Sequence, residues 1–95
     1  MNNKALEIIK HYGVMPQLKY FQSEVFELNE AIIIEEDRVQ HLGTKNWNTS
    51  HIAEEIADVM VFLTQFKEYY GITVEEIEKI MNEKIDRQLR RISNE

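Results

Sequence analysis

The 95-residue sequence contains no cysteine, only three glycines and a single proline. The lack of cysteine excludes a disulfide framework, a thiol nucleophile and a cysteine-ligated metal, and it fits a reducing compartment. Because glycine and proline are the residues that most often interrupt helices, their scarcity favours long continuous helices. The absences together predict an intracellular helical domain without covalent cross-links.

Long apolar runs are also missing. The N-terminal residues MNNKALEIIKHYG lack the apolar core of a signal peptide. No stretch approaches the roughly 18 consecutive apolar residues of a membrane span. We therefore expect a cytoplasmic protein that does not enter a membrane.

Positive charge is scarce as well, with 11 basic residues against 17 acidic ones and a net charge of −6. A protein that binds polymeric nucleic acid usually has a basic surface, which this balance argues against. The basic residues that are present gather near the C-terminus, at Lys84, Arg87, Arg90 and Arg91. Two kinds of ligand stay open: a small anion bound by this basic cluster, or a cation bound by the acids upstream.

The apolar residues that are present follow a helical period over most of the chain. Ninety-five residues suit one domain, which we take as 1–95. Steps of three and four predict two long helices, from Pro16 to about Asp37 and over 50–70. Shorter signals predict helices over 3–12 and 74–92, the last with a capping box of Thr73 and Glu76. No strand alternation is present, so the sequence predicts an all-α antiparallel bundle of three to four helices.

Two apolar stripes are expected to pack together. They consist of Leu18, Phe21, Val25, Leu28 and Ile32 on one helix, and Ile52, Ile56, Val59, Leu63 and Phe66 on the other. The segments AIII (31–34) and MVFL (60–63) are apolar on several faces, which is more than a small monomer should expose. We therefore expect oligomerisation to complete the bundle, as a homodimer or homotetramer. The connection 39–49 carries the only tryptophan, Trp47, which would either stack on a nucleobase or cover the bundle.

Pairs of acids border each stripe. Glu24 and Glu27 are three residues apart on the first long helix, and Glu55 and Asp58 repeat that spacing on the second. Residues at i and i+3 share a helix face, so packing of the stripes would bring the two pairs together. Converging carboxylates must turn into solvent, take up protons, or bind a hard cation such as Mg²⁺ or Mn²⁺. Glu54 is an alternative to Glu55 as the inward acid, because it lies four residues before Asp58.

The order of these motifs resembles a known family. QSEVFELNEAI (22–32), EEIADVMVFL (54–63) and GITVEEIEKIMNEKIDRQLRRI (71–92) are similar to the MazG family of all-α nucleoside triphosphate pyrophosphohydrolases. The shared pattern is ExxE, a variable gap, ExxD, and then a helix that carries lysine and arginine. The resemblance implies an oligomeric helical bundle and magnesium-dependent cleavage between the α and β phosphates. The substrate would be a nucleoside triphosphate.

The resemblance also implies roles for particular residues. Glu24, Glu27, Glu55 and Asp58 match the metal-binding acids, and Glu24 or Glu27 would be the general base. Lys84, Arg87 and Arg91 match the basic residues that meet the substrate phosphates, whereas Gln88 replaces the asparagine of many members. The competing interpretation is a non-catalytic, oligomeric helical module whose acidic faces are solvated. A basic helix end can also simply offset the helix dipole.

Overall fold

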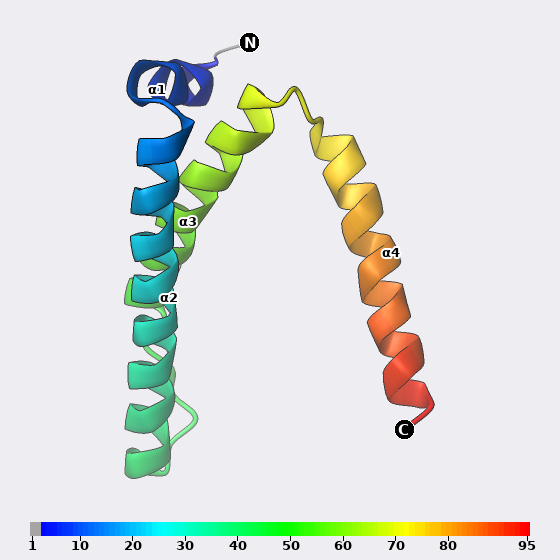
Figure 1. Cartoon of the computed structure of the whole chain (residues 1–95). Helices are drawn as coiled ribbons and strands as arrows, with labels where there is room; N and C mark the ends of the chain where they lie inside the picture. The colour runs from blue at the N-terminus through cyan, green and yellow to red at the C-terminus, as the bar shows by residue number, and fades with distance from the viewer. Residues whose placement is uncertain (1–2) are drawn as a thin grey trace.

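The computed structural model describes residues 3–95 and places most of them in four α-helices. These are α1 (Lys4–Tyr12), α2 (Val14–Leu42), α3 (Ser50–Tyr69) and α4 (Val74–Ser93). No strand occurs among the described residues, so the all-α prediction is confirmed. Helices α1, α2 and α3 pack together, with α3 returning along α2, while α4 projects away from them (Figure 1).

Helix α2 is longer than its sequence pattern predicted. It starts at Val14, so that Pro16 still falls in the first turn, where its missing N–H is not needed. It continues past Asp37 to Leu42 and ends at Gly43, which has a left-handed φ of 63°. The N–H of Gly43 reaches the carbonyl of Gln40, and the next N–H reaches that of Val39, the pattern of a Schellman motif. Part of the expected loop is therefore helix, and the true connection spans 43–49.

The faces that α2 and α3 turn toward each other coincide only in part with the predicted stripes, of which Phe21 and Phe66 are in contact. Three stripe residues, Ile32, Ile56 and Leu63, remain exposed. The buried positions of the two helices include polar and charged residues instead, namely Gln17, Glu35, Glu55 and Gln65. Both helices are thus rotated so that an edge of each stripe faces the partner helix.

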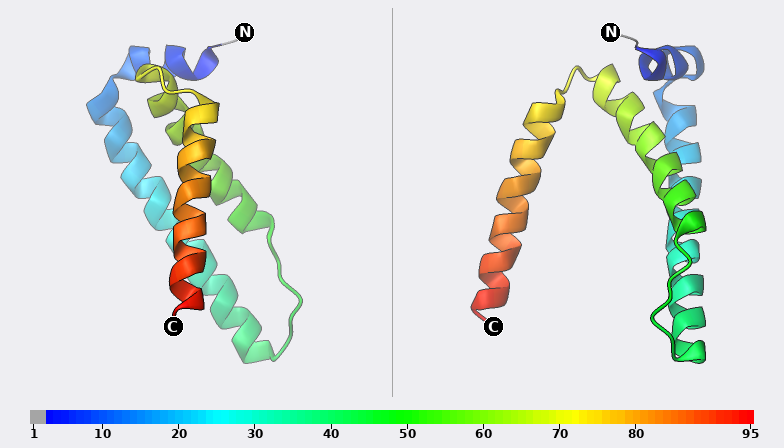
Figure 2. Two further views of the ribbon diagram at one scale, coloured as in Figure 1. Left: turned by 90° about the vertical axis from the view of Figure 1, so that its right-hand side faces the viewer. Right: turned by 180° about the vertical axis from the view of Figure 1, so that it is seen from behind.

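Helix α1 closes the end of the pair where α2 begins and α3 ends (Figure 2). Its Ile9 is fully buried. Nearby, the side chain of Gln17 donates a hydrogen bond of 2.8 Å to Gln65, and both glutamines are buried. Phe21 of α2 stacks edge-on against Phe66 of α3 at a centroid distance of 5.5 Å. This end of the molecule holds the best-packed part of the small core.

Helix α4 packs against none of α1, α2 and α3 within residues 3–95. Its start is well defined, because the Thr73 hydroxyl accepts a hydrogen bond of 3.1 Å from the N–H of Glu76, which is one of the two bonds of the predicted capping box. Its predicted antiparallel packing on the preceding helix, however, is not formed in the single chain. The Cα radius of gyration is 17.0 Å, against about 12 Å for a compact chain of this length. Among the described residues, no helix is both long and apolar enough to cross a bilayer.

Candidate metal centre

Two carboxylates face each other in the middle of the α2–α3 interface. Glu55 of α3 is 8% exposed, and Glu24 of α2 is half-buried beside it. Each has one oxygen, Oε2, that is buried and has no hydrogen-bond partner among the described residues. A buried carboxylate oxygen without a partner is costly, so both groups are left to be satisfied by a proton or a cation.

This environment raises the pKa of both carboxyls. Burial raises the pKa of Glu24, and the nearby charges of Glu27, Asp58 and Glu55 raise it further. Burial also raises the pKa of Glu55, with Glu27, Asp58 and Glu54 adding to the effect and His51 opposing it. The two shifts have the same sign because burial disfavours the charged form of both carboxyls and other acids surround them.

Asp58 completes a group that could hold a metal ion. One carboxylate oxygen from each of Glu24, Glu55 and Asp58 can be chosen so that all three lie within 4.8 Å of one another. Asp58 lies on the exposed rim of this group. The structure therefore brings together three of the four predicted acids. The fourth, Glu27, is exposed but close enough to raise the pKa of both Glu24 and Glu55.

The structure also distinguishes Glu55 from Glu54. Glu55 turns inward, whereas the Glu54 side chain is 79% exposed. His51 stands between them, with its Nε2 3.9 Å from Glu55 and its Nδ1 4.0 Å from Glu54. At these distances His51 offers only weak electrostatic compensation, since neither contact has hydrogen-bond length. Glu55 is thus the inward acid of the ExxD segment.

The chemistry of the donor set fits a hard divalent cation. All three groups offer carboxylate oxygens, which Mg²⁺ and Mn²⁺ prefer, and no cysteine or inward histidine supplies a softer ligand. The two unpartnered buried oxygens of Glu24 and Glu55 are the strongest indication, because a cation would satisfy both at once. The exposed rim at Asp58 leaves the group open to solvent on one side.

The predicted phosphate-binding residues lie elsewhere in the chain. Lys84, Arg87 and Arg91 are exposed on α4, which does not pack on the helices that carry the acids. No basic residue of α4 contributes to the pKa shifts of Glu24 or Glu55. In a single chain, the cationic and anionic halves of the predicted site are therefore separate.

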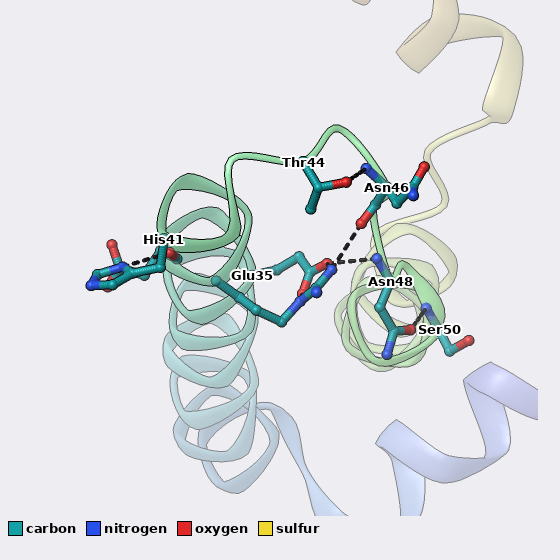
Figure 3. Close-up of polar contacts among 8 residues, drawn as sticks. Glu35, His41, Thr44, Asn46, Asn48 and Ser50 are labelled. Atoms are coloured by element: carbon teal, nitrogen blue, oxygen red, sulfur yellow. Dashed lines mark hydrogen bonds and ion pairs between the residues drawn. The ribbon is translucent and has the colours of Figure 1, made fainter.

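A second polar cluster anchors the connection between α2 and α3, which the sequence pattern did not indicate (Figure 3). Arg38 donates two hydrogen bonds to the Glu35 carboxylate, at 2.7 and 2.8 Å, and a third to the carbonyl of Asn46 at 2.9 Å. The N–H of Asn48 also donates to Glu35. We call Glu35, Arg38 and the backbone at Asn46 and Asn48 the loop clamp. The sequence feature that could have indicated this cluster is the i, i+3 spacing of Glu35 and Arg38 just before an asparagine-rich loop.

The loop clamp determines where Trp47 lies. Its two backbone contacts, at Asn46 and Asn48, flank the tryptophan on both sides. Trp47 is 49% exposed, so its ring is neither buried in the core nor free of the protein surface. The predicted base-contact residue is therefore accessible to solvent.

Comparison of the chain with protein-family models, with curated proteins and with solved structures found no match. The resemblance of the ExxE, ExxD and basic segments to the MazG family therefore stays a prediction from the sequence. What the fold and site define is a helical protein with a carboxylate cluster between its two longest packed helices.

Proposed function

We propose that this protein is a Mg²⁺-dependent nucleoside triphosphate pyrophosphohydrolase. It would cleave the α–β phosphoanhydride of (d)NTPs and release a nucleoside monophosphate and pyrophosphate. The observation that supports the proposal best is the pair of buried, unpartnered oxygens on Glu24 and Glu55, next to Asp58. The order of the ExxE, ExxD and basic segments along the chain supports the reaction class.

The acidic residues have two roles in this proposal, metal binding and general-base catalysis. Glu24, Glu55 and Asp58 hold the cation, with Glu27 at the exposed edge of the group as a further ligand. When bound, magnesium supplies positive charge that offsets the repulsion between these carboxylates and the triphosphate. Glu27 or Glu24 acts as general base, accepting a proton from the attacking water as the bond to pyrophosphate breaks.

The remaining residues bind the substrate. Lys84, Arg87 and Arg91 advance by three and four residues along α4, so one helix face presents all three to the phosphates. Trp47 offers an exposed ring on which a nucleobase can stack.

The direct test is an incubation with a panel of NTPs and dNTPs plus MgCl₂, with monophosphate and pyrophosphate as the measured products. A second measurement follows the melting temperature as Mg²⁺ or Mn²⁺ is added. We expect turnover of at least one nucleotide and a rise in melting temperature with the metal. Absence of both would overturn the proposal.

The matched pair Glu55→Gln and Glu54→Gln tests the site itself. Loss of residues that merely support metal ligands typically costs 10- to 100-fold, so we expect Glu55→Gln to reduce turnover by about 100-fold or more. Glu54→Gln changes an exposed neighbour and should retain turnover within about threefold, as surface changes usually do. Equal activity of the two variants would contradict the assignment of Glu55.

A second candidate function is a non-catalytic helical interaction module. The observation that favours it is the large number of exposed apolar residues, among them Phe26, Ile33, Met60 and Ile85. These are expected of any protein that assembles through its helices, whether or not it is an enzyme. Oligomerisation without turnover and without a metal-dependent melting shift would favour this candidate.

A further inference from the structure

One polar side chain beside the carboxylate cluster, His51, has no role in the function proposed above. It lies in the first turn of α3, four residues before Glu55, so the two side chains share a helix face. Its Nε2 is 3.9 Å from the Oε1 of Glu55. Because 65% of its side chain is exposed, His51 contributes little to the core of the protein. Its place at the edge of the cluster therefore calls for another explanation.

The two carboxylate oxygens of Glu55 have different surroundings. Oε2 is buried and has no hydrogen-bond partner among residues 3–95, whereas Oε1 faces the imidazole of His51. The same carboxylate can therefore serve a cation on its inner side and an N–H donor on its outer side. Carboxylates that bind metals in proteins are commonly hydrogen-bonded in this way by a neighbouring group, which fixes their orientation.

His51 is also the only basic side chain within 4.0 Å of Glu55 in the part of the chain that the structure describes. The other charged side chains that act on Glu55 are those of Glu27, Glu54 and Asp58, which are all acids and offer no N–H. If a side chain of this chain donates to Glu55, it is therefore that of His51.

The contact of 3.9 Å is longer than a hydrogen bond but close to one. An N–H···O bond extends to about 3.2 Å, so the two atoms have to approach by about 0.7 Å. Hydrogen bonds in functional sites are often long in the free protein and shorten when the ligand binds. The exposed ring of His51 can make this movement, since its only other charged contact is the one of 4.0 Å between Nδ1 and Glu54.

We propose that His51 is a positioning residue for Glu55, donating a hydrogen bond from Nε2–H to Oε1 and leaving Oε2 to the cation. The neutral imidazole suffices for this role, provided that its single proton is on Nε2. His51 itself does not bind the cation, because it is not part of the group of oxygens formed by Glu24, Glu55 and Asp58. The inference rests on the proposed function in one respect, namely that this group holds a metal ion.

Three replacements of His51 separate this role from a general effect of charge or size. Glutamine places an amide N–H where the imidazole has Nε2, asparagine places one where it has Nδ1, near Glu54, and leucine has no donor. The affinity for Mn²⁺ is measured by electron paramagnetic resonance of the unbound ion, without nucleotide. We expect His51→Leu and His51→Asn to weaken Mn²⁺ binding about tenfold. His51→Gln should stay within about threefold of wild type.

The control His41→Leu changes an exposed histidine in the last turn of α2 and should leave the affinity for Mn²⁺ unchanged. In EDTA, the melting temperatures of all four variants should lie within about 2 °C of wild type, because both histidines are exposed. A glutamine variant that binds Mn²⁺ as weakly as the leucine variant would overturn the positioning role, since the donor at Nε2 would then be irrelevant. Wild-type affinity in the leucine variant, or a wild type that binds no Mn²⁺, would overturn it as well.

Failure of this inference is distinguishable from failure of the proposed function. If the His51 variants bind Mn²⁺ in the expected order but the wild type hydrolyses no nucleotide, the positioning of Glu55 stands and the proposed reaction fails. If the wild type hydrolyses nucleotides and the three variants bind Mn²⁺ equally well, the reaction stands and the positioning role fails.

Discussion

Two glutamates on the same face of α2 have opposite electrostatic environments. Glu24 and Glu35 are eleven residues apart, close to three helical turns, so both point toward α3 and its connecting loop. Glu35 accepts hydrogen bonds from Arg38 and from the Asn48 N–H, which lower its pKa to about 2. The pKa of Glu24 is raised, by burial and by neighbouring acids. One carboxylate is fully provided with donors, and the other has a buried oxygen without any.

This difference separates a structural acid from a candidate functional one. Glu35 fixes the α2–α3 connection, and its charge is stabilised by the fold. Glu24 and Glu55 are destabilised by the fold as long as they remain charged, and natural proteins tolerate such groups mainly where they serve a function. Neutralising an acid should therefore have opposite effects on stability at the two places.

The largest effect on stability is expected for Glu35→Gln. The substitution leaves Arg38 without its carboxylate and weakens the contact to Asn48, so the melting temperature should fall by about 8 °C. The neighbouring Glu36→Gln, on the exposed side of the same helix, should change it by less than about 2 °C. Thermal melts at pH 7 measure both. Similar small effects would contradict a structural role for the loop clamp.

The pH dependence of this variant gives a further check. A carboxyl whose pKa is lowered on folding stabilises the native state above its unfolded pKa, and that contribution is lost as the pH falls. The difference between wild type and Glu35→Gln should therefore be constant near neutrality and shrink as the pH falls from about 4 to about 2. A difference that stays constant down to pH 2 would contradict the lowered pKa.

A somewhat smaller effect is expected at the buried glutamine pair. Gln65→Leu removes the acceptor of the Gln17 amide and leaves a buried donor unpaired, at a cost of about 1 kcal/mol. The double variant Gln17→Leu/Gln65→Leu replaces both partners and should recover most of that loss. Urea unfolding of the two variants measures the difference. If the double variant instead lost as much stability as the two single changes combined, the two glutamines would contribute to stability through contacts other than their mutual hydrogen bond.

The smallest effect, of opposite sign, is expected at Glu24 and Glu55. Their pKa values are raised on folding, so the folded protein binds more protons than the unfolded chain, and stability falls as the pH rises above about 4. In EDTA at pH 7, Glu24→Gln should raise the melting temperature by roughly 2–4 °C, with the gain vanishing toward pH 4. Saturating Mg²⁺ should reverse the order, because the metal stabilises only the wild type. A destabilised Glu24→Gln variant in EDTA would instead indicate a structural salt bridge.

The sequence pattern predicts the helices better than it predicts their faces. Periodicity located all four helices, and Gly13, Gly43 and Gly71 all lie at or next to their ends. The inward faces were misjudged at Ile32, Ile56 and Leu63, because apolar periodicity marks one face of a helix without showing how much of that face the neighbouring helix covers. The acids expected beside the stripe turned out to include Glu24 and Glu55 within the α2–α3 contact.

The candidate site was likewise only partly predictable from the sequence. The i, i+3 spacing placed each acid pair on one helix face, and the structure brings Glu24, Glu55 and Asp58 together. The loop clamp was not predictable in this way, because Glu35 is satisfied partly by backbone N–H groups whose positions depend on how residues 43–49 fold. The choice between Glu54 and Glu55 likewise depended on helix rotation.

By itself, the sequence determined the helical class, the helix ends and the two acid pairs, since local propensity, capping and spacing act within a few turns of one helix. Only the tertiary structure decided which side of each helix is buried, which acids lack a partner and where α4 lies. These features depend on contacts between residues distant in the chain, such as Glu24 with Glu55 and Gln17 with Gln65. The separation of α4 from the acids is the clearest case, because among the described residues α4 packs against none of the helices that carry them.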